Sequence, residues 1–141
     1  MNRKGSAVWT GDLKTGKGTV TTQSGTLSEA QYSFKTRFEE GVGTNPEELI
    51  AAAHAGCFSM QLSALLSEAG SVPERIATIS TLTLEFIDGK PTVTKMHLDT
   101  TAKIPGISDE DFQKHAKDAE QNCPISRLLK AEITMDATLE A

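Results

Sequence analysis

The sequence predicts an α+β fold in which antiparallel strands pack on one long central helix. Several short stretches alternate apolar and polar residues, which is typical of half-buried strands. One stretch, 49–67, contains no Asp, Glu, Lys or Arg, which is typical of a helix covered on all sides. A chain of 141 residues has the length of one ordinary domain, so we expect a single domain over 1–141.

Three strands are expected before the long helix. The stretches 6–10 and 18–22 are rich in β-branched residues and are separated by a glycine-containing turn. We expect the third strand at 32–38, where aromatic residues alternate with polar ones and Arg37 falls on the solvent-facing side.

The long helix is expected from Asn45 to about Ala69. Asn45 suits the N-cap, Pro46 suits the first helical position, and Glu48 completes a pattern that resembles a capping box. Small and polar residues dilute the apolar stretch too much for a membrane span. Because such a helix is roughly 38 Å long by its rise per residue, about six short strands do not cover it, and we expect a second copy of the chain to do so.

The remaining elements follow in order. Two strands, 76–86 and 96–104, flank the hairpin signal Asp88-Gly89. A helix begins after Ser108, a short helix follows Asn122-Cys123-Pro124, and a last strand covers 133–139. Together they predict an antiparallel α+β domain.

Charge and composition exclude several classes of partner. The net charge is −5 and the basic residues are scattered, so neither nucleic acid nor an anionic membrane is an expected partner. The N-terminus shows no apolar segment of a secretory signal, and we expect a cytoplasmic protein. Two cysteines are too few for a disulfide scaffold and are either buried fillers or reactive thiols.

Local reasoning leaves the roles of the two cysteines open. Cys57 lies twelve residues beyond the expected N-cap, where the helix dipole does not lower a thiol pKa. Cys123 precedes Pro124 at an expected helix start, so local electrostatics alone favour it as the more acidic thiol. His54 lies one turn before Cys57 and is expected to be a packed polar residue. The alternatives are that His54 tunes the thiol, or that it joins both cysteines around zinc, a site that lacks a clear fourth ligand.

Several motifs resemble one known family, the OsmC/Ohr proteins (osmotically inducible protein C and organic hydroperoxide resistance protein). They are Asn45-Pro46-Glu47-Glu48-Leu49, Ala51-Ala52-Ala53-His54-Ala55-Gly56-Cys57-Phe58 and Asn122-Cys123-Pro124-Ile125-Ser126. The likeness extends across the chain, and Trp9-Thr10-Gly11-Asp12 near the start looks like the OsmC branch.

The resemblance implies an intertwined homodimer that acts as a thiol peroxidase on organic hydroperoxides, an antioxidant role in osmotic or oxidative stress. Cys57 would be the peroxidatic thiol, and Cys123 would condense with its sulfenic acid to form a disulfide. An external thiol, with dihydrolipoyl groups as a candidate, would reopen the disulfide, and neither haem, metal nor flavin would be needed. Arg37 and Glu47 would support the thiolate.

Helix geometry indicates whether Arg37 and Glu47 act on the Cys57 of their own chain or of the other subunit. Glu47 and Cys57 are ten residues apart, roughly 15 Å along one helix, so we favour an Arg37–Glu47 pair that serves the Cys57 of the other subunit. The residues alone favour an ordinary solvated arginine at position 37 and a first-turn acid at position 47. Candidate linings of an apolar substrate pocket are Phe38, Phe58 and Met60. The alternative functions are a thiol redox sensor or binding protein without turnover, and a dimer whose cysteines only fill space.

Overall fold

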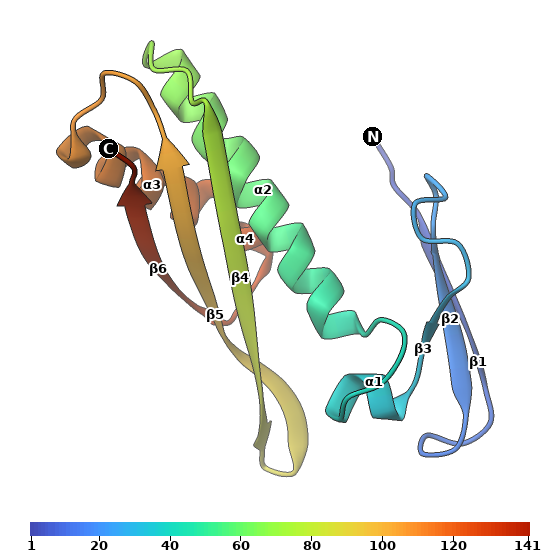
Figure 1. The fold of residues 1–141 in the computed structure, drawn as a ribbon. Helices are drawn as coiled ribbons and strands as arrows, with labels where there is room; N and C mark the ends of the chain where they lie inside the picture. Colours follow the sequence, from blue (N-terminus) through green and yellow to red (C-terminus); the bar gives the residue numbers. More distant parts are fainter. The chain divides into compact units, whose positions relative to one another are not determined.

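The computed structural model describes residues 1–141, and its chain forms two compact units, 1–49 and 50–141. Figure 1 shows the elements in chain order. The order is three strands, two helices, a long hairpin, two helices and a final strand. Both sheets have three strands. This mixture of sheets and a long helix confirms the predicted α+β class.

The N-terminal unit is built on the antiparallel sheet β1-β2-β3. Strand β1 is Gly5–Thr10, β2 is Lys17–Thr22 and β3 is Ala30–Tyr32. Gly18 on β2 lies where the Trp9 and Tyr32 rings leave no room for a side chain, and those rings are 5.4 Å apart. The two predicted N-terminal strands are therefore confirmed.

The prediction of a third strand over 32–38 is wrong. Strand β3 ends at Tyr32, and Phe34–Phe38 form the short helix α1. The cause is a capping box, because the Ser33 hydroxyl accepts a hydrogen bond from the Thr36 amide and the Thr36 hydroxyl accepts one from the Ser33 amide. Arg37 therefore lies in the last turn of a helix rather than on a strand face.

The long helix α2, Pro46–Glu68, begins where the sequence predicts. The Asn45 side-chain carbonyl accepts a hydrogen bond from the Glu48 amide at 2.7 Å, and the Glu48 carboxylate accepts one from the Asn45 side-chain amide at 3.2 Å. The helix is long and apolar enough to cross a membrane by length and composition alone. Its His54, Phe58, Leu62 and Leu66, however, are buried in the protein.

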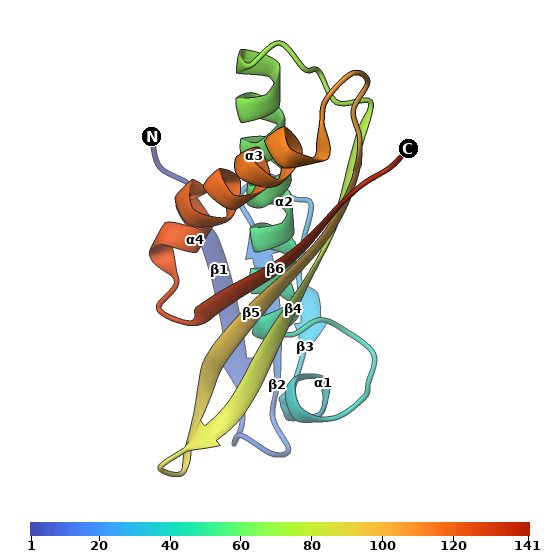
Figure 2. The same cartoon turned by 90° about the vertical axis from the view of Figure 1, so that its left-hand side faces the viewer.

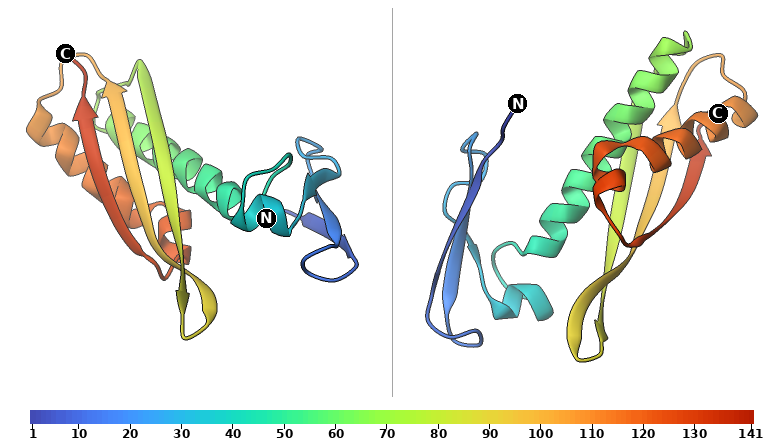
Figure 3. Two further views of the ribbon diagram at one scale, coloured as in Figure 1. Left: turned by 60° about the horizontal axis from the view of Figure 1, so that its bottom comes forward. Right: turned by 180° about the vertical axis from the view of Figure 1, so that it is seen from behind.

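The C-terminal unit places α2 and α3 on the same face of the sheet β4-β5-β6 (Figures 2 and 3). Strands β4, Arg75–Ile87, and β5, Lys90–Lys103, form the predicted hairpin around Asp88-Gly89. Strand β6, Glu132–Leu139, runs parallel to β5, which differs from the predicted antiparallel arrangement. Two helices lie between these strands, α3 at Asp109–Asn122 and α4 at Pro124–Leu128. They carry the chain from the end of β5 back toward its beginning, so β6 runs in the same direction as β5.

One hydrophobic core joins these elements. It contains Phe58, Leu62 and Leu66 of α2, together with residues of β5 and α3. The contributions of β5 and α3 are Leu98, Ala102, Phe112, Ala116 and Ala119. Cys123 belongs to this core, and Cys57 is packed against it. The fold thus brings the two cysteines into the same region from distant parts of the chain.

Candidate functional site

The two cysteines contact each other as free thiols. Cys57 is half-buried on α2, and Cys123 is fully buried at the junction of α3 and α4. The Cys57 thiol interacts with the Cys123 side chain and with the backbone of Ile125. The two thiols therefore interact although 66 positions separate them in the sequence.

Cys123 caps the helix that follows it. Its sulfur accepts a hydrogen bond from the Ser126 amide at 3.3 Å, and Pro124 occupies the first turn of α4. The same residue ends α3, because its amide donates to the Ala119 carbonyl at 3.0 Å. The sequence predicted this helix start. Backbone contacts on each side therefore hold Cys123 in place.

The environment of Cys57 favours its neutral form. Burial is the main cause that raises the pKa of the Cys57 thiol, and the neighbouring Cys123 raises it further. The interaction with the Ile125 backbone acts in the opposite direction and lowers that pKa. No cationic side chain is among the causes. A thiolate at Cys57 therefore requires a positive charge that these neighbours do not supply.

Two buried polar side chains extend the cysteine pair. The Cys123 thiol donates to the Ser126 hydroxyl at 3.0 Å, and Ser126 Oγ lies 2.8 Å from Nε2 of His54. His54 is fully buried, and its Nδ1 has no hydrogen-bond partner. The sequence drew attention to His54 but gave Ser126 no role beyond membership of a motif, since that role depends on a contact between α2 and α4. His54 therefore meets Cys123 through Ser126.

Arg37 and Glu47 form an ion pair in the N-terminal unit. Arg37 Nε donates to Glu47 Oε1 at 2.6 Å, and the Glu47 side chain is only 13% exposed. The pairing uses one bond, because the second Glu47 oxygen is buried without a partner. The Arg37 guanidinium also lies over the Phe38 ring, 5.4 Å from its centre. Glu47 and Phe38 thus fix the guanidinium while its two terminal nitrogens are left to bind another group.

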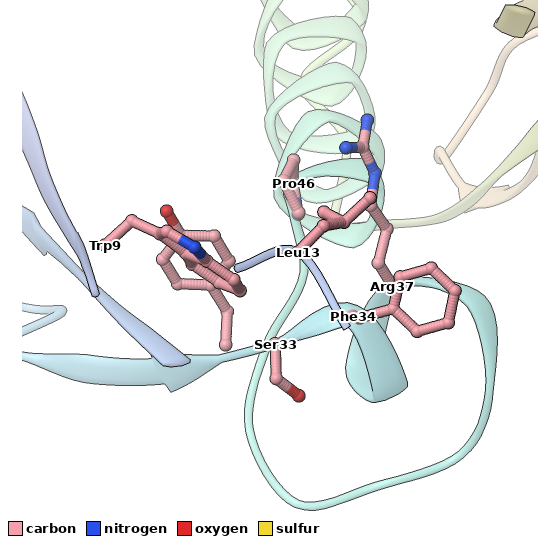
Figure 4. A pocket seen from close by; sticks show the side chains of 7 residues that line it. Trp9, Leu13, Ser33, Phe34, Arg37 and Pro46 are labelled. Carbon is pink, nitrogen blue, oxygen red and sulfur yellow. The ribbon is translucent and has the colours of Figure 1, made fainter. Parts of the chain in front are cut away.

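A pocket of about 260 Å³ lies beside this pair (Figure 4). Its lining is mostly apolar and comes from β1, the loop after it, β3, α1 and the first turn of α2. The lining residues are Trp9, Leu13, Tyr32, Ser33, Phe34, Arg37 and Pro46. Apart from Arg37, none of these residues was predicted to belong to a functional site, since an alternating aromatic pattern indicates buried rings but not which rings surround a cavity. The pocket provides one cationic group in an otherwise apolar surface.

The residues predicted to line a substrate pocket occupy three different environments. Phe38 contacts Arg37 and the Phe34 ring. Phe58 is fully buried in the core, and the Met60 side chain is 76% exposed on α2. The three residues do not line a common pocket, so their role as a substrate lining stays a prediction.

The zinc alternative has no support from the arrangement of side chains. The structure contains no group of three or more His, Cys, Asp and Glu side chains positioned to hold a metal ion. His54, Cys57 and Cys123 therefore do not form such a group, even though they lie in one region.

Known proteins match this chain over its full length. Residues 39–138 match the model of the family described as OsmC-like protein. The chain is 48% identical to "Peroxiredoxin OsmC" of Escherichia coli (strain K12) over 141 residues, which are 100% of this chain and 99% of that protein. It is 31% identical to "Organic hydroperoxide resistance protein-like 1" of Staphylococcus epidermidis over 103 residues, 72% of each chain.

Solved structures share the fold. The OsmC-like protein of Mycoplasma pneumoniae superposes with a TM-score of 0.78 at 14% identity and covers 100% of this chain and 99% of its own. The organic hydroperoxide resistance protein OhrB of Bacillus subtilis gives a TM-score of 0.69 at 20% identity, with 97% of this chain and 98% of its own covered. The motifs, the sequence identity and the fold agree, and the chain belongs to the OsmC-like protein family.

Proposed function

We propose that this protein is a cysteine-based peroxidase that reduces organic hydroperoxides to alcohols. One observation supports this most strongly: two free thiols contact each other in a chain that is 48% identical over its full length to a protein named Peroxiredoxin OsmC. The organic substrate is suggested by the relatives named for organic hydroperoxide resistance.

The proposed cycle uses both thiols. The Cys57 thiolate attacks the terminal peroxide oxygen, an alcohol leaves, and Cys57 becomes a sulfenic acid. Cys123 attacks that sulfur, water leaves, and the Cys57–Cys123 disulfide forms. An external dithiol then reduces the disulfide by thiol–disulfide exchange, with dihydrolipoyl groups as the candidate reductant. The cycle needs no haem, flavin or metal, because the sulfur atoms carry both electrons.

Arg37 and Glu47 are proposed to supply the missing positive charge. Burial raises the pKa of Cys57, so the thiol needs a cation to react at neutral pH. Arg37 is fixed through Nε to Glu47 and keeps its terminal nitrogens free to face a thiolate. Because Glu47 and Cys57 are ten residues apart on α2, roughly 15 Å by the helical rise, we assign Arg37 to the Cys57 of the partner subunit.

The surface of α2 supports the proposed homodimer. An uncharged stripe on the helix is exposed, and its members follow helical spacing: Ala53, Gly56, Met60, Ala64 and Ser67. A monomer would leave this stripe in water, whereas a second copy would cover it. In this proposal, residues 1–141 act as one domain of a cytoplasmic homodimer, with neither nucleic acid nor membrane as a partner.

The pocket beside Arg37 suits the organic part of the substrate. Its rings and aliphatic side chains would hold an alkyl group, and Arg37 would lie near the peroxide oxygens. Phe38 and Met60 are further candidate contacts, whereas Phe58 would act through the core against which Cys57 packs. Hydrogen peroxide has no alkyl group, so the pocket would favour organic hydroperoxides.

A steady-state assay tests the function. With excess dithiol, the protein should consume many equivalents of an alkyl hydroperoxide per chain and act more slowly on hydrogen peroxide. Cys57→Ser should abolish consumption, and Cys123→Ser should leave a sulfenic acid that a trapping reagent captures. Consumption of a single equivalent would instead identify a redox sensor, and thiols that stay reduced would refute both functions.

Two further experiments test the assembly. Mixing Arg37→Ala chains with Cys57→Ser chains should restore one complete site per heterodimer, and loss of activity in a proven heterodimer would place each site within one chain. Sedimentation should show a dimer that Met60→Asp converts to a monomer. The matched control is Val72→Asp, which changes an exposed apolar residue outside α2.

A further inference from the structure

A chain of hydrogen bonds leads from the second thiol to a buried imidazole. The Cys123 thiol donates to Ser126 Oγ at 3.0 Å, and Ser126 Oγ lies 2.8 Å from Nε2 of His54. All three side chains are at least nine-tenths buried. His54 lies one turn before Cys57 on α2, yet its hydrogen bond goes to Ser126. The imidazole is therefore placed to act on Cys123 rather than on Cys57.

The direction of the hydrogen bonds follows from the neighbours. The sulfur of Cys123 already accepts a hydrogen bond from the Ser126 amide, and its own hydrogen points to the Ser126 hydroxyl. The hydroxyl hydrogen is then free to be donated to Nε2 of His54. A proton that leaves Cys123 can therefore pass to Ser126 while the Ser126 proton passes to His54.

Packing alone does not explain the imidazole. Nδ1 of His54 is buried without a partner, which costs free energy that an apolar side chain at this position would not. Burial also lowers the pKa of His54, which keeps the ring neutral and able to accept a proton. A polar group kept in a core at such a cost is a sign of chemical use.

One charged group acts on the ring. Glu120 of α3 is nearly buried and raises the pKa of His54 against the effect of burial. Lys117 binds the Glu120 carboxylate at 3.2 Å and 3.3 Å. Helix α2 contributes no charged side chain between Leu49 and Ser67. Glu120 therefore stabilises the imidazolium that forms when His54 takes up a proton.

We propose that Ser126 and His54 form a proton relay that activates Cys123 when it closes the disulfide. This inference rests on the proposed peroxidase cycle. The S–H bond of Cys123 breaks, the S–S bond to Cys57 forms and the S–O bond of the sulfenic acid breaks. The proton moves through Ser126 to His54, and the leaving hydroxide takes up a proton to become water, which returns His54 to its neutral form. The hydroperoxide has already supplied the oxidation.

Single-turnover kinetics separate the two steps of the cycle. One equivalent of alkyl hydroperoxide is mixed with reduced protein, and sulfenic acid formation and disulfide closure are timed separately. Ser126→Ala and His54→Gln should leave Cys57 oxidation within about twofold of wild type and slow closure at least tenfold at pH 7, since general base catalysis commonly contributes 10²-fold or more. Ser126→Thr keeps the hydroxyl and should restore most of the rate.

The pH profile distinguishes the relay from a structural role. Closure in the wild-type protein should be nearly independent of pH above the pKa of His54, whereas closure in Ser126→Ala should rise with pH because hydroxide replaces the relay. The matched control is Ser59→Ala on α2, the helix that carries His54; it removes a hydroxyl bonded to Thr78 and should change neither rate nor profile. Circular dichroism identifies any variant that fails to fold.

A second oxidant makes the test independent of the hydroperoxide reaction. Diamide adds to Cys57, and Cys123 then displaces it to give the same disulfide. If the wild-type protein forms the disulfide with diamide but does not react with hydroperoxide, the proposed peroxidase function fails. The closure rates with diamide still test the relay in that case. Wild-type closure rates and pH profiles in both Ser126→Ala and His54→Gln, with either oxidant, would overturn the relay.

Discussion

Replacing Arg37 with alanine should destabilise the N-terminal unit, because it leaves the Glu47 carboxylate without a partner. Glu47 is 13% exposed, its Oε2 is buried and unpaired, and its Oε1 depends on Arg37 Nε at 2.6 Å. Water reaches the arginine more easily, since that side chain is 39% exposed. The pair therefore lies between an exposed and a buried ion pair.

The magnitude follows from that position. Hydrogen bonds to charged groups contribute about 1.5–3 kcal/mol when partly buried, and exposed ion pairs contribute about 1 kcal/mol or less. Screening at Arg37 favours the lower part of the first range, so we expect Arg37→Ala to cost about 2 kcal/mol. With an unfolding entropy of about 2.1 cal/mol/K per residue, this lowers Tm by about 7 °C for a chain of this length.

The assay is a double-mutant cycle of Arg37→Ala and Glu47→Gln in urea, at fixed protein concentration. Fluorescence of Trp9, the single tryptophan, reports on the same unit as the ion pair. We expect a coupling energy of about 1–2 kcal/mol that falls only partly in high salt. Lys35→Ala on α1, which removes an exposed charge without an ion pair, should change stability by less than about 0.5 kcal/mol. A coupling energy indistinguishable from zero would refute the pairing.

Three other perturbations give distinct outcomes. Burial lowers the pKa of His54, so below pH about 6.5 the unfolded chain takes up a proton that the folded chain does not. The free energy of unfolding should therefore decrease as the pH is lowered below that value, by at most about 1.4 kcal/mol per pH unit. Urea midpoints measured across this pH range should show that His54→Gln removes the slope. Ser33→Ala should cost about 1 kcal/mol in urea unfolding by removing the hydrogen bond to the Thr36 amide, whereas Ser33→Asp should restore most of it, and equal losses in both would argue against the cap. Gly43→Ala should lower Tm more than Gly25→Ala, since both glycines have positive φ but only the first faces the backbone of Gln31, and similar losses would contradict that close contact.

The sequence predicted most elements, and its one misassigned element has a physical cause. Phe34 and Phe38 are four residues apart, a spacing that fits both a strand face and one side of a helix. The alternating aromatics favoured the strand, but Ser33 and Thr36 form a capping box that starts helix α1 instead. A local hydrogen-bond pattern thus prevailed over periodicity.

Other features depend on contacts that no local pattern contains. Alternation in 133–139 predicted strand β6, but not its parallel pairing with β5, which α3 and α4 determine. The helix start expected at Pro124 predicted where Cys123 lies in the chain of elements, but its contact with Cys57 depends on how α2 packs against the α3–α4 junction. Ser126 belonged to a quoted motif, but its contact with His54 could not be predicted for the same reason.

The register of α2 suits the role proposed for Cys57 as the reactive thiol. His54 and Phe58 point into the core, whereas Gly56 and Met60 lie on the exposed stripe. At about 100° per residue, Cys57 falls between these two faces, and it is half-buried. A thiol at position 58 would be sealed in the core away from a hydroperoxide, and one at position 60 would be in solvent and turned away from the core that holds Cys123. Only the flank lets one sulfur contact Cys123 from the core side and, as the proposed function requires, remain open to a substrate and to Arg37 of the proposed partner subunit.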